Sequence, residues 1–228
     1  MIATSPSGEN GVRTFPPVTL TLIVLCVVAF LLQNSLGNPA LYDFMLWPLG
    51  QFSDRMQNGE VVTVGFELWQ LVSYAFLHGD MGHLFFNMFA LYMFGAPLEH
   101  TWGSQRFAVY YFVSVIGAGL VQLAVVSYAV THGGELYPTI GASGGVFGVL
   151  LAYGMLFPNH RVMLLFPPIP MKARTFVIGY GLLELILGVT RSQEGVAHFA
   201  HLGGMLFGFV LLQYWRRRWP FSPPVRRG

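Results

Sequence analysis

The sequence predicts an all-α membrane protein, built as a bundle of six transmembrane helices. The chain of 228 residues is 54% hydrophobic and only 10% charged, whereas a soluble domain usually carries about 25% charged residues. Six apolar segments approach the length of about 20 residues that a helix needs to cross a bilayer. They cover residues 18–33, 82–98, 107–130, 143–157, 176–190 and 197–215.

The segment between the first two apolar runs, residues 35–81, contains many aromatic residues interleaved with polar ones. This composition favours the membrane–water interface, so we expect a long interfacial loop there. No repeat or linker divides the chain, and we expect a single membrane domain over residues 1–228. Short tails belong to it, 1–17 at the N-terminus and the basic stretch 216–228 at the C-terminus.

The basic residues predict how the bundle is oriented. If both termini are cytoplasmic, ten of the twelve lysines and arginines lie inside and only Arg55 and Arg191 lie outside, which satisfies the positive-inside rule. A short chain without a transit peptide or a soluble extension is expected in the plasma (inner) membrane of a prokaryote. The net charge of +2 is too small to indicate a nucleic-acid partner.

A serine stands at the predicted start of the fourth helix, in the motif GASGGVFG that begins at Gly141. A serine in that position can project its oxygen into a cavity, and the amides at a helix N-terminus can stabilise an anion beside it. Gly144 and Gly148 form a small-xxx-small face that allows close helix packing. Because serine and glycine pack helices throughout membranes, this motif alone is a weak sign of catalysis.

Two histidines begin the sixth apolar segment, in the motif AHFAHLGG that starts at Ala197. Histidines in an apolar span are costly and indicate function, and Gly204 and Gly208 offer a second small-xxx-small face. Contact between the two glycine faces would bring an imidazole to Ser143, and imidazole is the usual base for a serine. For His198 a structural hydrogen bond across helices is the favoured interpretation.

A third group, His78, His83 and Asn87, lies at the start of the second helix, with Asp80 as its expected N-cap. His83 and Asn87 are four residues apart and therefore share one helix face. An imidazole and an amide aimed into a cavity can donate to a developing oxyanion. They can equally serve as polar contacts between helices.

Neither a metal nor any other cofactor is expected. The sequence has no H-E-x-x-H motif, which is typical of metalloproteases, and no carboxylate inside a span is expected to accompany the histidine pairs. Glu184 is the one acidic residue well inside an apolar segment. It leaves a transporter open as an alternative, because such residues often mark ion or proton paths.

Taken together and in order, four motifs resemble the rhomboid family of intramembrane serine proteases. The resemblance rests on His78-x4-His83-x3-Asn87, on Gly95-x3-Glu99 followed by Trp102-Gly103, on Gly141-Ala142-Ser143-Gly144, and on Ala200-His201-Leu202-Gly203-Gly204 with Gly208. It implies a six-helix bundle with a water-filled cavity open to the outer side. It also implies an endopeptidase that cleaves transmembrane segments of other membrane proteins within the lipid bilayer.

The resemblance assigns roles to individual residues. Ser143 would be the nucleophile and His201 the base, in a dyad without a catalytic aspartate, while His83, Asn87 and the Ser143 amide would form the oxyanion hole. His78 would support the loop above, and Phe147 would pack on the histidine. Two positions depart from the family pattern: Gln70 stands where many members have an arginine, and Phe147 stands where some members have a tyrosine. A non-catalytic protein that binds transmembrane helices is the main alternative.

Overall fold

The computed structural model describes residues 15–36, 38–55, 59, 61–163, 168–190 and 197–218. Most of the predicted N-terminal tail 1–17 and all of the C-terminal tail beyond residue 218 lie outside these residues. Four of the basic residues that predict the orientation, Arg13, Arg191, Arg226 and Arg227, also lie outside them.

Helices dominate the described residues, and all six apolar segments fall on them. In chain order the helical elements are α1 (Pro17–Leu36), η1 (Asn38–Phe44), α2 (Gln70–Ser73), η2 (Tyr74–Phe76), α3 (Met81–Ala90), η3 (Leu91–Gly95), α4 (Ala96–Trp102), α5 (Ser104–Thr131), α6 (Ser143–Leu156), α7 (Ala173–Thr190) and α8 (His198–Arg218). By length and composition α1, α5 and α7 are long and apolar enough to cross a membrane, and α6 is a shorter apolar helix. The chain is therefore a mostly helical membrane protein, while the count of six spans stays a prediction.

Two short hairpins qualify the all-α prediction. Strand β1 (Gln51–Arg55) pairs antiparallel with β2 (Val61–Gly65) inside the predicted interfacial segment. Strand β3 (Arg161–Met163) pairs antiparallel with β4 (Pro170–Lys172) between α6 and α7. Each strand is three to five residues long, and such short runs give too little alternation to be recognised in a sequence dominated by helical segments.

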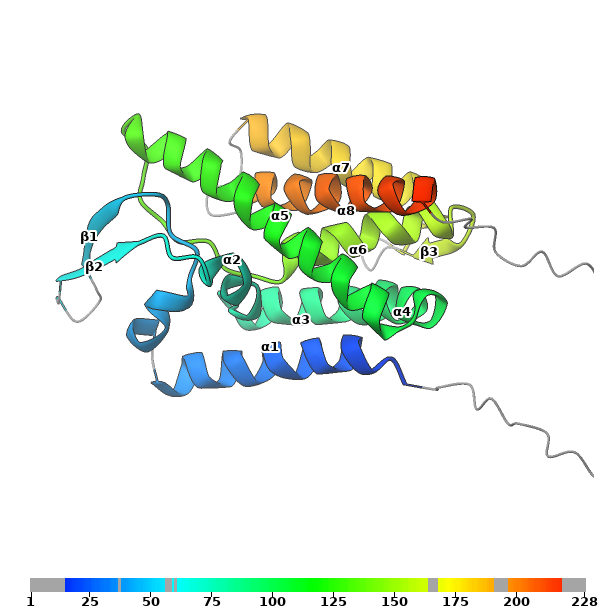
Figure 1. Ribbon diagram of the computed structural model, residues 1–228, viewed down its shortest axis with the longest axis horizontal. Coiled ribbons are helices and arrows are strands. Elements are labelled where there is room, and N and C mark those ends of the chain that lie inside the picture. The colour runs from blue at the N-terminus through cyan, green and yellow to red at the C-terminus, as the bar shows by residue number, and fades with distance from the viewer. Residues whose placement is uncertain are drawn as a thin grey trace, which may run out of the picture.

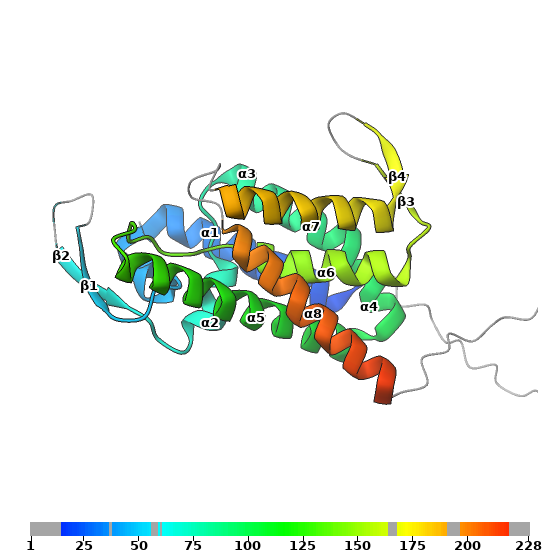
Figure 2. The same ribbon diagram turned by 90° about the horizontal axis from the view of Figure 1, so that it is seen from above.

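The helices form a bundle with α1 and α7 on opposite sides and α3, α5, α6 and α8 between them (Figure 1). The start of α1 and the end of α8 lie at one end of the bundle, and the β1–β2 hairpin projects from the other (Figures 1 and 2). Large apolar side chains are exposed along α1 and α7, as expected of helices that face lipid. Helix α6 begins well inside the length of α5 (Figure 1), so its first residue lies within the bundle.

Close packing of α6 against α8 depends on glycines, as the spacing of the two glycine faces predicts. A Cβ atom at Gly204 would overlap the carbonyl oxygen of Gly144, and one at Gly148 would lie 3.1 Å from the carbonyl oxygen of Gly204. At Gly208 a Cβ would lie 3.1 Å from the hydroxyl of Ser114 on α5. The backbones of α6 and α8 approach to a distance that only small residues permit, and Gly208 leaves room for a side chain of α5.

The loop before α3 is anchored by Gln70, one of the two positions at which the sequence departs from the family that it resembles. Its buried side chain accepts a hydrogen bond from the Trp47 amide at 3.2 Å and donates to the carbonyl oxygens of Asp43 and Gly65 at 3.2 and 3.1 Å. Glutamine is neutral, so it satisfies three backbone groups without burying a charge. The loop therefore has a structural anchor at this position.

A second anchor, Glu99, joins the beginning of α1 to the turn between α4 and α5. Its carboxylate accepts hydrogen bonds from the amides of Val18 and Thr19 at 2.9 and 2.8 Å, and from the hydroxyls of Thr19 and Ser104 at 2.8 and 2.7 Å. The side chain is only 3% exposed. It satisfies amides of the first turn of α1, which have no partner within their own helix.

We predict that Glu99→Gln lowers stability without changing the site described below. The amide NH2 group cannot accept the hydrogen bonds that one carboxylate oxygen now receives, and loss of charge-assisted hydrogen bonds costs about 2 kcal/mol. Thermal unfolding in detergent should show a melting temperature several degrees lower. Glu135→Gln is the matched control, because Glu135 is exposed. Equal melting temperatures for the two variants would contradict this role of Glu99.

Candidate functional site

The loop before α6 delivers Ser143 to the interior of the bundle. Gly141, with φ at +129°, lies in a backbone region that favours glycine, and its amide donates to the carbonyl oxygen of Tyr74 at 2.9 Å. Two residues earlier, Thr139 pairs with Leu46 in an antiparallel bridge. These contacts fix the entry of the chain into α6, whose first residue is Ser143.

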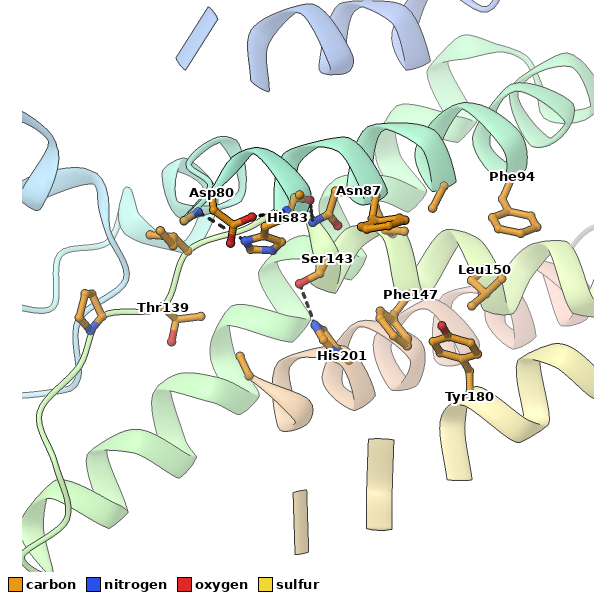
Figure 3. Close-up of a pocket in the computed structure, with 18 of the residues that line it drawn as sticks. Asp80, His83, Asn87, Phe94, Thr139, Ser143, Phe147, Leu150, Tyr180 and His201 are labelled. Carbon is orange, nitrogen blue, oxygen red and sulfur yellow. Dashed lines mark hydrogen bonds between the residues drawn. The ribbon is translucent and has the colours of Figure 1, made fainter. Parts of the chain in front are cut away.

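The side chains of Ser143 and His201 meet across the α6–α8 contact. The Ser143 Oγ lies 2.8 Å from His201 Nε2 (Figure 3), although the residues are 58 positions apart. Phe147, one turn after the serine, stacks flat on the imidazole with ring centroids 4.2 Å apart and planes inclined by 6°. The serine is half-buried and the histidine is buried.

The other nitrogen of His201 meets an acid that the sequence analysis did not place here. Glu184 of α7 has its Oε2 atom 2.9 Å from His201 Nδ1 and 2.7 Å from His198 Nδ1. The expectation that no carboxylate accompanies the histidines is therefore wrong. The predicted hydrogen bond of His198 across helices is confirmed, with Glu184 as its partner. The sequence did contain a signal for this contact, namely a lone acid in one apolar segment and two histidines in the next. Helical periodicity, however, does not reveal which faces of two different helices meet.

Glu184, His198 and His201 could also be considered as metal ligands, since one ligand atom from each lies within 4.8 Å of the others. However, both Nδ1 atoms lie at hydrogen-bond distance from the same carboxylate oxygen. A metal site would instead place its ligands around a common centre at about 2.0–2.2 Å. The arrangement is that of a hydrogen-bonded cluster.

Helix α3 places His83 beside the serine. Its cap is Asp80, as predicted, whose carboxylate accepts from the His83 amide at 2.8 Å. A Cβ at Gly141 would lie 2.8 Å from His83 Nε2 and 3.6 Å from Ser143 Oγ, so the imidazole and the hydroxyl flank this glycine. Asn87 lies one turn further along the helix, where its Nδ2 donates to the carbonyl oxygen of His83 at 2.9 Å.

His78 is not among the residues that line the cavity around Ser143 but lies behind His83, with the ring centroids 5.1 Å apart. Its backbone is held by Gln33 of α1, which accepts from the His78 amide at 3.0 Å and donates to its carbonyl oxygen at 3.3 Å. Burial, followed by the nearby His83, lowers the pKa of His78 to about 4. The ring is therefore neutral at pH 7, and the backbone of His78 joins the loop before α3 to α1.

A cavity of about 840 Å³ connects these side chains (Figure 3). Ser143, His201, His83 and Asn87 all line it. The remainder of the wall is largely apolar, and includes Phe86, Phe94, Val146, Phe147, Leu150, Phe176 and Tyr180. A few polar groups that converge in an otherwise apolar cavity are typical of a binding or catalytic site.

Comparison with known proteins assigns the chain to a family. Residues 65–218 match the family model described as the rhomboid domain. The chain is 30% identical over 206 residues to a protein of Serratia proteamaculans named rhomboid protease GlpG, covering 89% of this chain and 63% of that protein. Proteins of the same name from Yersinia pseudotuberculosis and Klebsiella pneumoniae are each 25% identical, over 89% and 86% of this chain and 63% and 62% of their own lengths.

The chain belongs to the rhomboid family. This confirms the resemblance carried by the four sequence motifs. The chain spans less than two thirds of the length of these relatives. All three relatives are bacterial, and together with helices that are long and apolar enough to cross a bilayer they indicate a bacterial inner-membrane protein.

Proposed function

We propose that the protein is an intramembrane serine endopeptidase that cleaves transmembrane segments of other membrane proteins. The single observation that carries this proposal is the 2.8 Å contact between Ser143 Oγ and His201 Nε2 in the wall of the cavity. Nucleophile and base within hydrogen-bond reach are the signature of covalent catalysis by serine. Membership of a family whose relatives are named rhomboid proteases supports the same assignment.

The reaction follows from these two side chains. His201 Nε2 takes the hydroxyl proton as Ser143 Oγ attacks the carbonyl carbon of the scissile peptide. The tetrahedral intermediate collapses to an acyl-enzyme, and the leaving amine receives the proton from His201. Water from the cavity then attacks the ester with the same histidine as base, and releases the carboxylate product. A substrate with a small residue before the cut, in a helix that unwinds easily, suits this mechanism.

His83 and Asn87 are the side chains that we assign to the oxyanion hole, together with the Ser143 amide. Both line the cavity on the α3 side, and His83 Nε2 faces Gly141 next to the serine. In the substrate-free structure the Asn87 amide donates to its own helix. Rotation about the side chain would redirect it into the cavity, and catalytic hydrogen bonds are often incomplete until substrate binds.

The bundle is proposed to span the membrane six times with both termini in the cytoplasm. The start of α1 and the end of α8 lie at the same end of the bundle (Figure 1), as an even number of spans requires. The β1–β2 hairpin and the segment 35–81 then lie on the outer side, at the membrane interface. The cavity would open toward that side and supply water for hydrolysis.

We predict that Ser143→Ala abolishes labelling by a fluorophosphonate probe and cleavage of a transmembrane substrate. His201→Ala should reduce both by at least about 10³-fold, since nucleophile and base act as a unit. The matched controls are Ser35→Ala and His132→Ala, because both side chains are exposed and should leave labelling unchanged. Near-normal turnover by either Ser143→Ala or His201→Ala would exclude the proposed dyad.

We predict that Asn87→Ala lowers kcat by roughly 10²–10³-fold and changes KM little. A donor to the oxyanion acts mainly in the transition state. Asn34→Ala is the matched control, because Asn34 makes the same contact four residues back along its own helix, to Phe30 at 2.8 Å, on α1 and away from the cavity. If Asn87→Ala only lowered the melting temperature and kept a normal kcat, Asn87 would be a contact between helices and not an oxyanion donor.

Reporter fusions test the proposed orientation. A reporter after residue 218 and one inserted between β3 and β4 should both report the cytoplasm, whereas one inserted between β1 and β2 should report the opposite side. The excess of basic residues on the proposed inner side is the physical reason. A cytoplasmic signal from the β1–β2 hairpin would mean that the bundle has the opposite orientation and that the cavity opens toward the cytoplasm.

A further inference from the structure

Glu184 lies on the opposite side of the His201 ring from Ser143. Ser143 Oγ contacts Nε2 at 2.8 Å, and Glu184 Oε2 contacts Nδ1 at 2.9 Å. Ser143 belongs to α6, His201 to α8 and Glu184 to α7. The two hydrogen bonds link the three helices through the imidazole. The rhomboid resemblance implies a serine and a histidine without a catalytic aspartate, so the proposed dyad leaves this carboxylate unexplained.

The carboxylate is held in place by close helix packing. Glu184 is 6% exposed, and one turn further along α7, a Cβ at Gly188 would lie 3.1 Å from the Cβ of His198. This glycine allows α7 to lie against the start of α8, where both histidines stand. A buried carboxylate is costly unless it is paired. Here two imidazole nitrogens reach the same oxygen, so the acid has a defined position.

The hydrogen bond to Glu184 decides which nitrogen of His201 carries the proton. An ionised carboxylate only accepts hydrogen bonds, so Nδ1 must be the donor. In the neutral ring Nε2 is then an unprotonated acceptor, and it faces the hydroxyl of Ser143. This tautomer is the one that a general base requires, and in serine proteases of other folds a buried aspartate imposes it.

We propose that Glu184 is a positioning residue, which holds His201 in the orientation and tautomer that accept the proton of Ser143. This inference rests on the proposed protease function and adds a third member to the dyad. The base stays His201. When Nε2 takes the serine proton, the ring becomes a cation with Glu184 at Nδ1, and the proton later passes from Nε2 to the leaving amine. Glu184 remains ionised throughout and stabilises the cation.

His198 is the second donor to the carboxylate and keeps Oε2 directed at the cluster. It contacts Glu184 at 2.7 Å, and its ring lies 6.4 Å from that of His201. Among the described residues, the polar groups shown next to His201 are Glu184 from α7, Ser143 from α6 and His198 from its own helix. His83 of α3 lines the same cavity. Among these residues only Glu184 and Ser143 bond to the His201 ring.

Glu184→Gln tests the charge while keeping the shape of the side chain. We expect kcat for a transmembrane substrate to fall by about 10²-fold or more with KM changed little, because a serine protease of another fold loses about 10⁴-fold when the acid becomes an amide. Glu99→Gln is the matched control, since it alters another buried carboxylate at a distance from the site. It should lower the melting temperature and leave kcat unchanged. His198→Ala should keep substantial activity, because His201 keeps its carboxylate.

The pH–rate profile separates positioning from a purely structural role. The anion favours the protonated ring, so in Glu184→Gln the acid limb of kcat should move to lower pH while the plateau falls. A structural role would lower the amount of active enzyme and leave the limb in place. A kcat within about twofold of wild type, or an unmoved acid limb, would overturn the proposal.

A measurement on the wild-type protein covers the case in which Glu184→Gln does not fold. With ¹⁵N-labelled histidine, NMR should show His201 as the Nδ1-protonated tautomer at the pH of activity, and the Nε2-protonated tautomer would overturn the proposal. Assaying Ser143→Ala in the same experiment distinguishes a failure of the proposed protease function from a failure of the proposed role of Glu184. If wild type shows no labelling or cleavage, the protease function fails. If wild type is active, Ser143→Ala is inactive and Glu184→Gln is fully active, only the role of Glu184 fails.

Discussion

The close approach of α6 to α8 is the contact on which the rest of the structure depends. Gly144 and Gly148 on one helix face Gly204 on the other, at separations that leave no room for a Cβ. A larger residue at Gly204 would collide with the Gly144 backbone and push α8 away from α6, whereas one at Gly144 or Gly148 would first meet Ala118 or Ser114 of α5. A hydrogen bond between α6 and α8 would not survive such a separation. The contact between Ser143 and His201, and with it the proposed chemistry, exists because these backbones nearly touch.

A second constraint is that buried polar groups in an apolar bundle must satisfy one another. Among the described residues, Glu99 binds the first turn of α1, Gln70 binds three backbone groups of the loop, and Glu184 joins two histidines. Each contact ties together elements that are distant in the sequence. Since an unsatisfied polar group is costly in such surroundings, these contacts limit the arrangements that the helices can adopt.

Several features of the site could be predicted because their cause is local. The cap of α3 by Asp80 depends on four consecutive positions, and the shared face of His83 and Asn87 follows from helical periodicity alone. The matching glycine spacings predicted that α6 and α8 meet. The two short hairpins could not be predicted because their strands are too short to show a clear alternation. The anchoring by Gln70 could not be predicted because partners such as Trp47 reach its side chain only in the folded chain.

The sequence by itself determined the class of protein, the apolar helices and the residue types of the site, because length, hydropathy and motif spacing are local properties of the chain. The tertiary structure alone decided that Glu184 meets the second nitrogen of His201. Whether two side chains on different helices meet depends on the rotation and depth of each helix within the bundle. Those quantities are set by packing, here by the approach of α7 to α8 at Gly188, and hydropathy does not encode them.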